Sequence, residues 1–342
     1  MDINLDTINV SQSVIKMIGD IDLFNGRWPL LKQKIEFNLG NLKHISTIAS
    51  IGSSTRIEGV SLSDEDIDRF LDHIDKDSFL SRDQQEVLGY KDIVTHIFDS
   101  YDDIDISENA IKHLHKILLS FSDKDDFHLG NYKKFDNNVT AQHSGKTVGI
   151  IFKTATPFET PEKMRHLLAW YSKNEPIHAL VKCAVFIVHF LAIHPFQDGN
   201  GRLSRALTTL IMLKHGYHYV PYCSLESVIE ANKSDYYKAL RKTQMSLTTQ
   251  PDYEPWFSFF FTCLLKQQAI LANKEAQLKP ALNKNQKKLL AFAETVHVFQ
   301  NSEASEHLKM NKNTVKLNLK KLCDLNLLKK EGTGKGTWYR RF

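Results

Sequence analysis

The residue types most able to do chemistry lie close together, in the sequence HPFQDGNGRLSR at positions 194–205. An apolar run with helical spacing precedes them. Because Pro195 disfavours helical geometry at the residue before it, we expect that helix to end with His194 at its edge. A tight loop with two glycines follows, and a second helix is expected to open at Gly201 and Arg202.

This loop and helix start have the features of an anion-binding site. Glycines let backbone N–H groups approach a ligand, and a helix N-terminus adds its positive pole. The helix dipole disfavours Arg202 and Arg205 by about 0.3 to 1 kcal/mol each, and an anion such as a polyphosphate would reverse that sign. Asp198 then suits Mg²⁺, which one or two carboxylates plus substrate phosphates usually hold. His194 is the nearby side chain suited to act as a general base.

The twelve residues His194–Arg205 resemble the complete HPFx[D/E]GNGRxxR signature of Fic-domain proteins. The resemblance implies transfer of AMP from ATP to a hydroxyl side chain of a target protein, with Mg²⁺ as the metal. It implies that His194 deprotonates the hydroxyl, that Asp198 holds the metal, and that two arginines bind the β and γ phosphates. The nucleotide contacts that it assigns to the signature are Asp198, Gly199, Asn200, Gly201, Arg202, Leu203, Ser204 and Arg205.

The segment 137–157 breaks the helical pattern. Two short β-prone runs around Ser144 and Gly145 predict a projecting β-hairpin. The hairpin resembles the flap of the same family, which implies that it covers the nucleotide and that its edge aligns a target segment by β-pairing. Tyr236 and Tyr237 resemble the aromatic pair near the adenine. The flap residues expected over the nucleotide are Val148, Gly149, Ile150 and Ile151.

A second motif, STRIEG at positions 54–59, resembles the [S/T]xxxE[G/N] inhibitory motif of Fic proteins that their own N-terminal region regulates. We expect Glu58 in the last turn of a helix, where a carboxylate meets the negative pole and needs a cation. Pairing with Arg205 would occupy the arginine needed for the γ-phosphate, so ATP would bind only in an unproductive pose. The resemblance thus assigns the inhibitory role to Glu58 and Ser54.

Helical periodicity dominates the rest of the chain and predicts a mainly α fold. The expected helices are 35–57, 64–74, 84–98, 107–121, 161–172, 177–193, 202–215, 234–243 and 253–277. His113 and His115, two apart on one helix, face different directions, which argues against a metal site there. We divide the chain into an N-terminal helical region with the inhibitory helix (1–106), a catalytic core (107–272), a polar linker (273–284) and a C-terminal domain (285–342).

The net charge of +4 is unevenly distributed along the chain. Residues 283–342 hold 13 Lys and Arg against five Asp and Glu, a net +8, whereas residues 1–282 carry a net −4. The tail has the order helix, helix, helix, β-hairpin that is typical of a winged helix-turn-helix domain. Its third helix presents Lys312, Lys316 and Lys320 on one face as candidates for DNA binding, with protein docking or dimerisation as the alternative.

Composition excludes several classes of protein. With 42% hydrophobic residues the chain is not mainly disordered, and no apolar run reaches the roughly 18 to 20 residues that span a bilayer. The N-terminus has no signal-peptide pattern, so we expect a cytoplasmic protein without a membrane partner.

The sequence thus predicts an autoinhibited protein adenylyltransferase that uses ATP and Mg²⁺ and modifies a Ser, Thr or Tyr hydroxyl of a target protein or of itself. The sequence is also compatible with a homodimer. Three alternatives stay open. They are a DNA-binding transcriptional regulator whose Fic core senses nucleotide with little turnover, removal of AMP from targets by the same site, and transfer of another phosphate-linked group.

Overall fold

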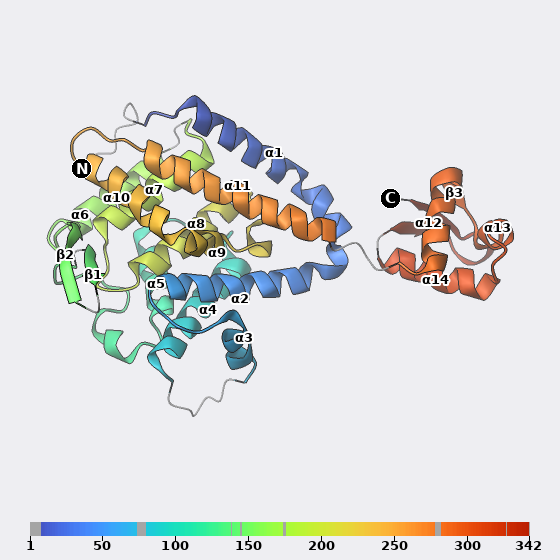
Figure 1. Cartoon of the computed structure of the whole chain (residues 1–342), viewed down its shortest axis with the longest axis horizontal. Helices are drawn as coiled ribbons and strands as arrows, with labels where there is room; N and C mark the ends of the chain where they lie inside the picture. Colours follow the sequence, from blue (N-terminus) through green and yellow to red (C-terminus); the bar gives the residue numbers. More distant parts are fainter. Residues whose placement is uncertain are drawn as a thin grey trace. The chain divides into compact units, whose positions relative to one another are not determined.

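The computed structural model describes residues 8–73, 80–137, 139–143, 146–173, 176–277, 282–325 and 327–341. The chain forms two compact units, Met1–Asn25 with Lys43–Ala269, and Gly26–Leu42 with Ile270–Phe342. Helices predominate in both, which confirms the predicted mainly α fold (Figure 1). Among the described residues, no helix combines the length and the apolar character needed to cross a membrane.

The helices and strands follow the sequence prediction closely in the middle of the chain. The α-helices are α1 (Gln12–Lys34), α2 (Leu39–Ile57), α3 (Asp64–Asp72), α4 (Arg82–Ser100), α5 (Glu108–Leu118), α6 (Thr160–Ser172), α7 (Ala179–Ile193), α8 (Asn200–Lys214), α9 (Leu225–Ala231), α10 (Lys233–Ser246), α11 (Glu254–Gln277), α12 (Lys284–Val296), α13 (Asn301–His307) and α14 (Lys312–Asp324). The strands are β1 (Val139–His143), β2 (Lys146–Phe152), β3 (Val298–Phe299), β4 (Leu328–Glu331) and β5 (Trp338–Arg341).

Helix α1 is the largest element that the sequence did not predict. Its segment contains Gly19, Gly26 and Pro29, which are residues that usually interrupt helices. The buried side chains of Ile18 and Ile21 show that packing of one face overrides these local signals.

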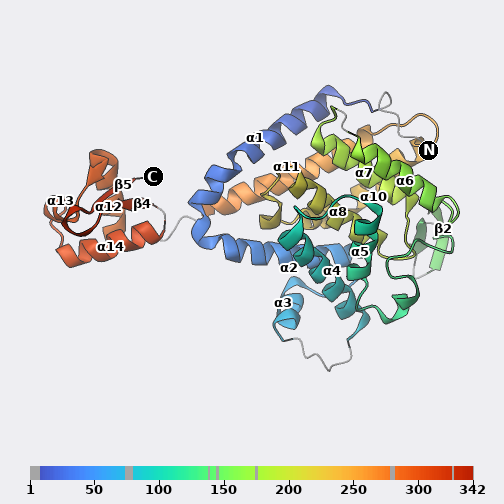
Figure 2. The same ribbon diagram turned by 180° about the vertical axis from the view of Figure 1, so that it is seen from behind.

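Helices α7 and α8 form the centre of the larger unit. Almost every side chain of α7 is buried, and α7 packs against α6, α8 and α10 (Figures 1 and 2). Helix α8 packs in turn against α4 and α5. The loop 194–199 that joins α7 and α8 is therefore held between two rigid, well-packed helices.

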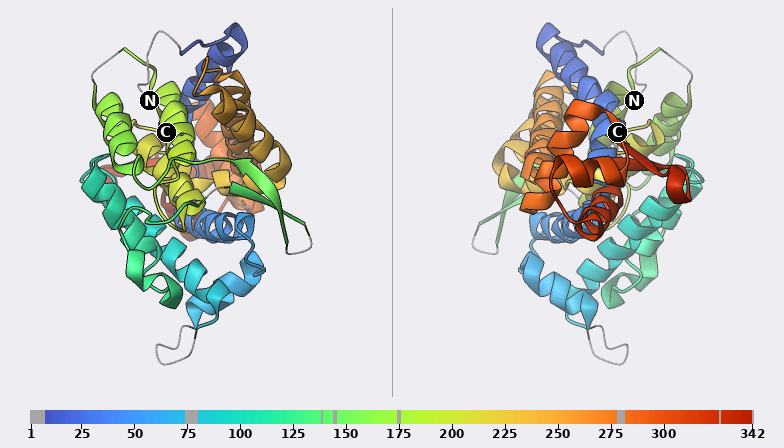
Figure 3. Two further views of the ribbon diagram at one scale, coloured as in Figure 1. Left: turned by 90° about the vertical axis from the view of Figure 1, so that its left-hand side faces the viewer. Right: turned by 90° about the vertical axis from the view of Figure 1, so that its right-hand side faces the viewer.

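Strands β1 and β2 pair antiparallel, with Thr140 opposite Ile150 and Gln142 opposite Thr147. This confirms the predicted hairpin, which stands out from the surrounding helices (Figure 3, left). Helix α10 packs against β2. The expected turn residues, Ser144 and Gly145, lie outside the described residues.

In the smaller unit, α12 and α14 pack on a three-stranded antiparallel sheet of order β3-β5-β4, and α13 packs against α14. Asn311 caps α14 by accepting a hydrogen bond from the backbone of Asn313. Gln300 occupies the N-cap of α13. The core consists of Leu289, Phe292, Ala293, Phe299, Ala304, Val315, Leu319, Leu322, Leu328 and Tyr339.

The predicted linker 273–284 is shorter than expected. Helix α11 continues to Gln277 and α12 starts at Lys284, so the two helices take up both ends of the segment. Residues 278–281 lie outside the described residues.

Candidate active site

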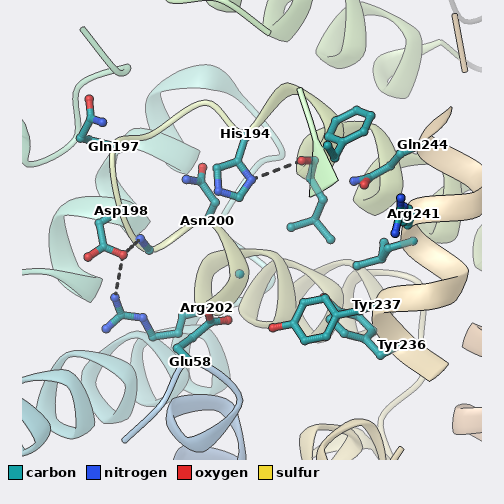
Figure 4. Close-up of a pocket in the computed structure, with 15 residues that line it drawn as sticks. Glu58, His194, Gln197, Asp198, Asn200, Arg202, Tyr236, Tyr237, Arg241 and Gln244 are labelled. Atoms are coloured by element: carbon teal, nitrogen blue, oxygen red, sulfur yellow. Dashed lines mark hydrogen bonds and ion pairs between the residues drawn. The ribbon is translucent and has the colours of Figure 1, made fainter. Parts of the chain in front are cut away.

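His194 lies directly after the last residue of α7, as Pro195 predicts. It adopts a left-handed conformation (φ 53°, ψ 60°), and its N–H donates to Phe190 O at 2.9 Å. The ring Nδ1 lies 3.3 Å from Leu191 O. Because a carbonyl oxygen only accepts, Nδ1 carries the proton there and Nε2 keeps its lone pair. The ring lines a pocket of about 270 Å³ (Figure 4).

Lys133 holds the backbone around His194. Its buried ammonium donates to Asn137 Oδ1 at 2.7 Å, Thr154 Oγ1 at 3.0 Å and Ile193 O at 3.1 Å. Burial, followed by the charge of Lys133, lowers the pKa of His194 to about 4, and burial lowers the pKa of Lys133 to about 8. The imidazole is therefore neutral at pH 7, which is the form that accepts a proton.

The side chain of Asn200 braces the loop after His194. Its Oδ1 accepts from Phe196 N–H at 2.9 Å, and its Nδ2 donates to Phe196 O at 2.7 Å. Gly199 has φ 79°, a conformation that glycine adopts without strain, and α8 starts at Asn200, one residue earlier than predicted. No side chain caps the N-terminus of α8 among the described residues, so its first turn is suited to an anion.

His115 supports the same loop, a role that sequence reasoning missed. Its Nε2 donates to Asp198 O at 3.1 Å, and its Nδ1 accepts from Gly130 N–H at 3.0 Å. The ring stacks on Phe196 with centroids 3.8 Å apart, and burial lowers its pKa to about 4. The neutral ring of His115 therefore links the loop at Asp198 to the backbone of Gly130. The one signal in the sequence was its helical spacing from Ile111 and Leu118, which are buried on the same side of α5.

Asp198 and Arg202 contact each other at the pocket wall. Asp198 Oδ1 accepts from Gly199 N–H at 2.5 Å and lies 3.3 Å from Arg202 Nη2. Arg202 is 2% exposed, and its Nη1 lies 3.1 Å from Glu86 Oε2, a partner that the sequence did not reveal. Within the described residues, Arg202 Nε is buried and makes no hydrogen bond. Such a donor favours an anionic ligand.

Arg205 is joined to the end of α2. Its Nε donates to Ser54 Oγ, and its Nη2 donates to Ser54 O and to Glu58 Oε1, each at 2.8 Å. Burial acts to lower the pKa of Arg205, but the Glu58 carboxylate outweighs it, so the pKa is raised. A Cβ on Gly201 would clash with Glu58 Oε1, so this carboxylate lies directly on the first turn of α8. Glu58 is the first residue after α2, not part of its last turn as expected.

The rest of the pocket wall comes mainly from α10. Tyr236 is buried and Tyr237 is 41% exposed, with ring centroids 5.1 Å apart. Sequence reasoning missed Arg241 and Gln244, although their helical spacing from Tyr237 places them on one face. The lining residues are Glu58, Phe152, Leu191, His194, Gln197, Asp198, Gly199, Asn200, Gly201, Arg202, Tyr236, Tyr237, Leu240, Arg241 and Gln244.

Several predicted nucleotide contacts lie outside this lining. Leu203 is fully buried in the core, and Ser204 Oγ donates to Gly201 O at 2.8 Å. Arg205 is buried, and its Nη2 is bonded to the Glu58 carboxylate. The backbone of Val148, Gly149, Ile150 and Ile151 forms part of β2, and their side chains lie outside the described residues. The signature thus contains residues that pack the helix as well as residues that face the pocket.

The model of the Fic/DOC family matches residues 105–212, which contain His194, the loop and most of α8. Over 96 residues the chain is 31% identical to a probable protein adenylyltransferase from Aquifex aeolicus, covering 28% of each protein. Over 99 residues it is 34% identical to a Fido domain-containing protein from Dictyostelium discoideum, covering 27% of this chain and 64% of that protein. The chain thus matches less than two thirds of the length of either relative.

Solved structures share the fold. A Fic family protein from Desulfovibrio desulfuricans has a TM-score of 0.65 at 20% identity, over 98% of both chains. A Fic domain-containing signalling protein from Bacteroides thetaiotaomicron has a TM-score of 0.61 at 20% identity, over 77% of this chain and 99% of its own. Residues 105–212 thus match the Fic/DOC family model, and the chain shares its fold with these solved structures.

Proposed function

We propose that the protein transfers AMP from ATP to a hydroxyl side chain of a target protein, or of itself, and releases pyrophosphate. The observation that carries the proposal is one pocket in which a neutral His194, the Asp198 carboxylate and Arg202 surround the uncapped N-terminus of α8. A base beside a site for several phosphates suits attack by a hydroxyl on a nucleotide. The Aquifex relative, named a probable protein adenylyltransferase, supports the same reaction.

In the proposed reaction, the hydroxyl oxygen of the target attacks the α-phosphorus of ATP. His194 Nε2 accepts the hydroxyl proton, and the bond from the α-phosphorus to the bridging oxygen breaks to release pyrophosphate. Arg202 and the backbone N–H groups at the start of α8 stabilise the charge on the leaving phosphates. The aromatic side chains of Tyr236 and Tyr237 offer an apolar wall for the base.

Asp198 fits the role of a Mg²⁺ ligand. It is the one acidic side chain of the loop, it lines the pocket, and its oxygen atoms are the hard donors that Mg²⁺ prefers. The described residues hold no cluster of three or more His, Cys, Asp or Glu that could bind a metal alone. A bound Mg²⁺ would supply charge neutralisation for the phosphates, which would themselves complete its coordination.

We further propose that Glu58 holds the enzyme in an inhibited state. Its carboxylate takes up Arg205 Nη2 and places negative charge on the turn of α8 that the phosphates need. The β-hairpin is proposed to close over the nucleotide and align a target segment along its edge.

The position of a radioactive label tests the reaction type. We expect the Glu58→Gly variant, incubated with Mg²⁺ and ATP labelled at the α-phosphate, to become labelled, and to stay unlabelled with γ-labelled ATP. The reason is that adenylyl transfer retains the α-phosphate and releases the γ-phosphate in pyrophosphate. Phosphate on the protein from γ-labelled ATP would contradict the proposal. Loss of a previously attached AMP, without net labelling, would favour removal of AMP by the same site.

For the smaller unit we propose a winged helix-turn-helix domain that binds duplex DNA through α14. Lys316 and Lys320 line a groove of about 580 Å³ together with Leu317 and with Lys330 of β4. Leu317 is 59% exposed, whereas Leu319 faces the core. An exposed helix face with lysines and one apolar side chain matches what a recognition helix offers to the major groove.

Replacing Lys312, Lys316 and Lys320 together with alanine is expected to weaken binding to a fluorescent DNA duplex. The plot of the logarithm of affinity against the logarithm of salt concentration should become less steep, its negative slope falling in magnitude by about three, because each lysine–phosphate contact releases about one counterion. Anisotropy titrations at several KCl concentrations measure it. The exposed Lys284, Lys287 and Lys288 of α12 provide a control triple variant. An equal loss in both variants, or no salt-dependent binding, would point to a protein partner instead.

A further inference from the structure

An arginine lies two residues before Glu58, and its guanidinium donates four hydrogen bonds and forms an ion pair with Asp64. Arg56 Nε and Nη2 bind the two carboxylate oxygens of Glu230 in α9, at 2.7 and 3.0 Å. Its Nη1 lies 2.9 Å from Asp64 Oδ1 and donates to Leu62 O at 3.0 Å. The remaining Nη2 proton reaches Ser53 Oγ at 3.3 Å. We call Arg56, Glu230 and Asp64 the Arg56 clamp.

The Arg56 clamp fixes the backbone on both sides of Glu58. On one side, Arg56 belongs to the last turn of α2. On the other side, it holds Leu62 and the start of α3, which follow Glu58 after a short loop. The Val60 N–H adds a hydrogen bond back to Thr55 O at 3.2 Å. Bidentate arginine–carboxylate pairs restrict direction as well as distance, so the position of the loop is strongly defined.

Gly52 gives a second, independent indication that the sequence reserves space for this arrangement. It lies inside α2, where glycine costs about 1 kcal/mol relative to alanine. A Cβ at this position would come within 2.5 Å of Arg56 Nη1 and closer still to Asp64 Oδ1. Any other residue would therefore force the guanidinium or the Asp64 carboxylate to shift.

We propose that Arg56 is a positioning residue that keeps the Glu58 carboxylate on Arg205 through its ion pairs with Glu230 and Asp64. The proposal rests on the proposed inhibitory role of Glu58. Within the described residues, the side chain of Arg56 forms its hydrogen bonds and ion pairs with Ser53, Leu62, Asp64 and Glu230, none of which lines the pocket. It therefore controls the inhibited state from outside the site. Loosening the Arg56 clamp lets Glu58 leave Arg205 while the catalytic residues stay unchanged.

The test uses Glu230→Gln and Arg56→Lys in the full chain. Both should raise self-labelling from α-labelled ATP roughly ten-fold, since each weakens hydrogen bonds to charged groups. Arg69→Ala, which removes an exposed arginine that pairs with Asp66 on α3, is the matched control and should change nothing. In a Glu58→Gly background the clamp variants should give no further rise, a result that a general loss of structure would not produce.

Hydrogen exchange at residues 58–60 separates this inference from the proposed reaction. Faster exchange there in Glu230→Gln, with an unchanged melting temperature, supports the clamp even if no variant is catalytically active. Unchanged exchange overturns it. If Glu58→Gly is active but Glu230→Gln and Arg56→Lys label like the wild type, the clamp does not position Glu58. If Glu58→Gly itself stays inactive, the inhibitory proposal fails, and exchange alone decides the clamp.

Discussion

Replacing Glu58 with glycine is expected to raise the rate at which the protein labels itself from Mg-ATP by about 100-fold. This is the usual contribution of one hydrogen-bond donor to the charge that develops in a transition state. In the structure, Arg205 Nη2 is taken up by Glu58, and Arg205 Nη1 is buried without an acceptor among the described residues. Glycine removes the competing carboxylate and the negative charge beside Gly201. The initial rate of α-label incorporation, compared with that of the wild type, measures the effect.

Glu58→Gln gives the matched control. The glutamine keeps the length and one acceptor oxygen but loses the charge, so it should remain near Arg205 and give a smaller rise than glycine. Glycine at this position costs little helix stability, because α2 ends at Ile57. Labelling by Glu58→Gly at or below the wild-type rate would remove the inhibitory role from Glu58.

Two kinds of local signal made the site predictable from the sequence. Pro195 ended α7 at a defined residue, and the glycines around Asn200 marked a loop that leads into a helix. Because these constraints act between neighbouring residues, they located His194 and the start of α8 without knowledge of the fold. The pairing of Glu58 with Arg205 was reached through a resemblance of motifs and is confirmed as a contact at 2.8 Å.

The supporting residues were not predictable in the same way. His115 and Glu86 reach the loop and Arg202 only because α5 and α4 pack on α8, and sequence spacing carries no information on that packing. The linear signature also could not show that Leu203 faces the core. The helix period predicts which residues share a face, but the surrounding helices decide which face meets the pocket.

Replacing His194 with alanine in the Glu58→Gly background is expected to lower self-labelling by about 1,000-fold, within the range for loss of a general base. The structure gives the reason, since Nδ1 is held by Leu191 O and the neutral ring offers Nε2 to the pocket. The backbone of His194 bonds to Phe190 O whatever the side chain, so ATP binding and the melting temperature should change little. Labelling rate, ATP affinity and melting temperature are measured together.

The control variant His113→Ala, which removes an exposed histidine of α5, should label itself at the same rate as its Glu58→Gly parent. If the alanine variant kept more than about a tenth of the parent rate, another group would have to accept the hydroxyl proton.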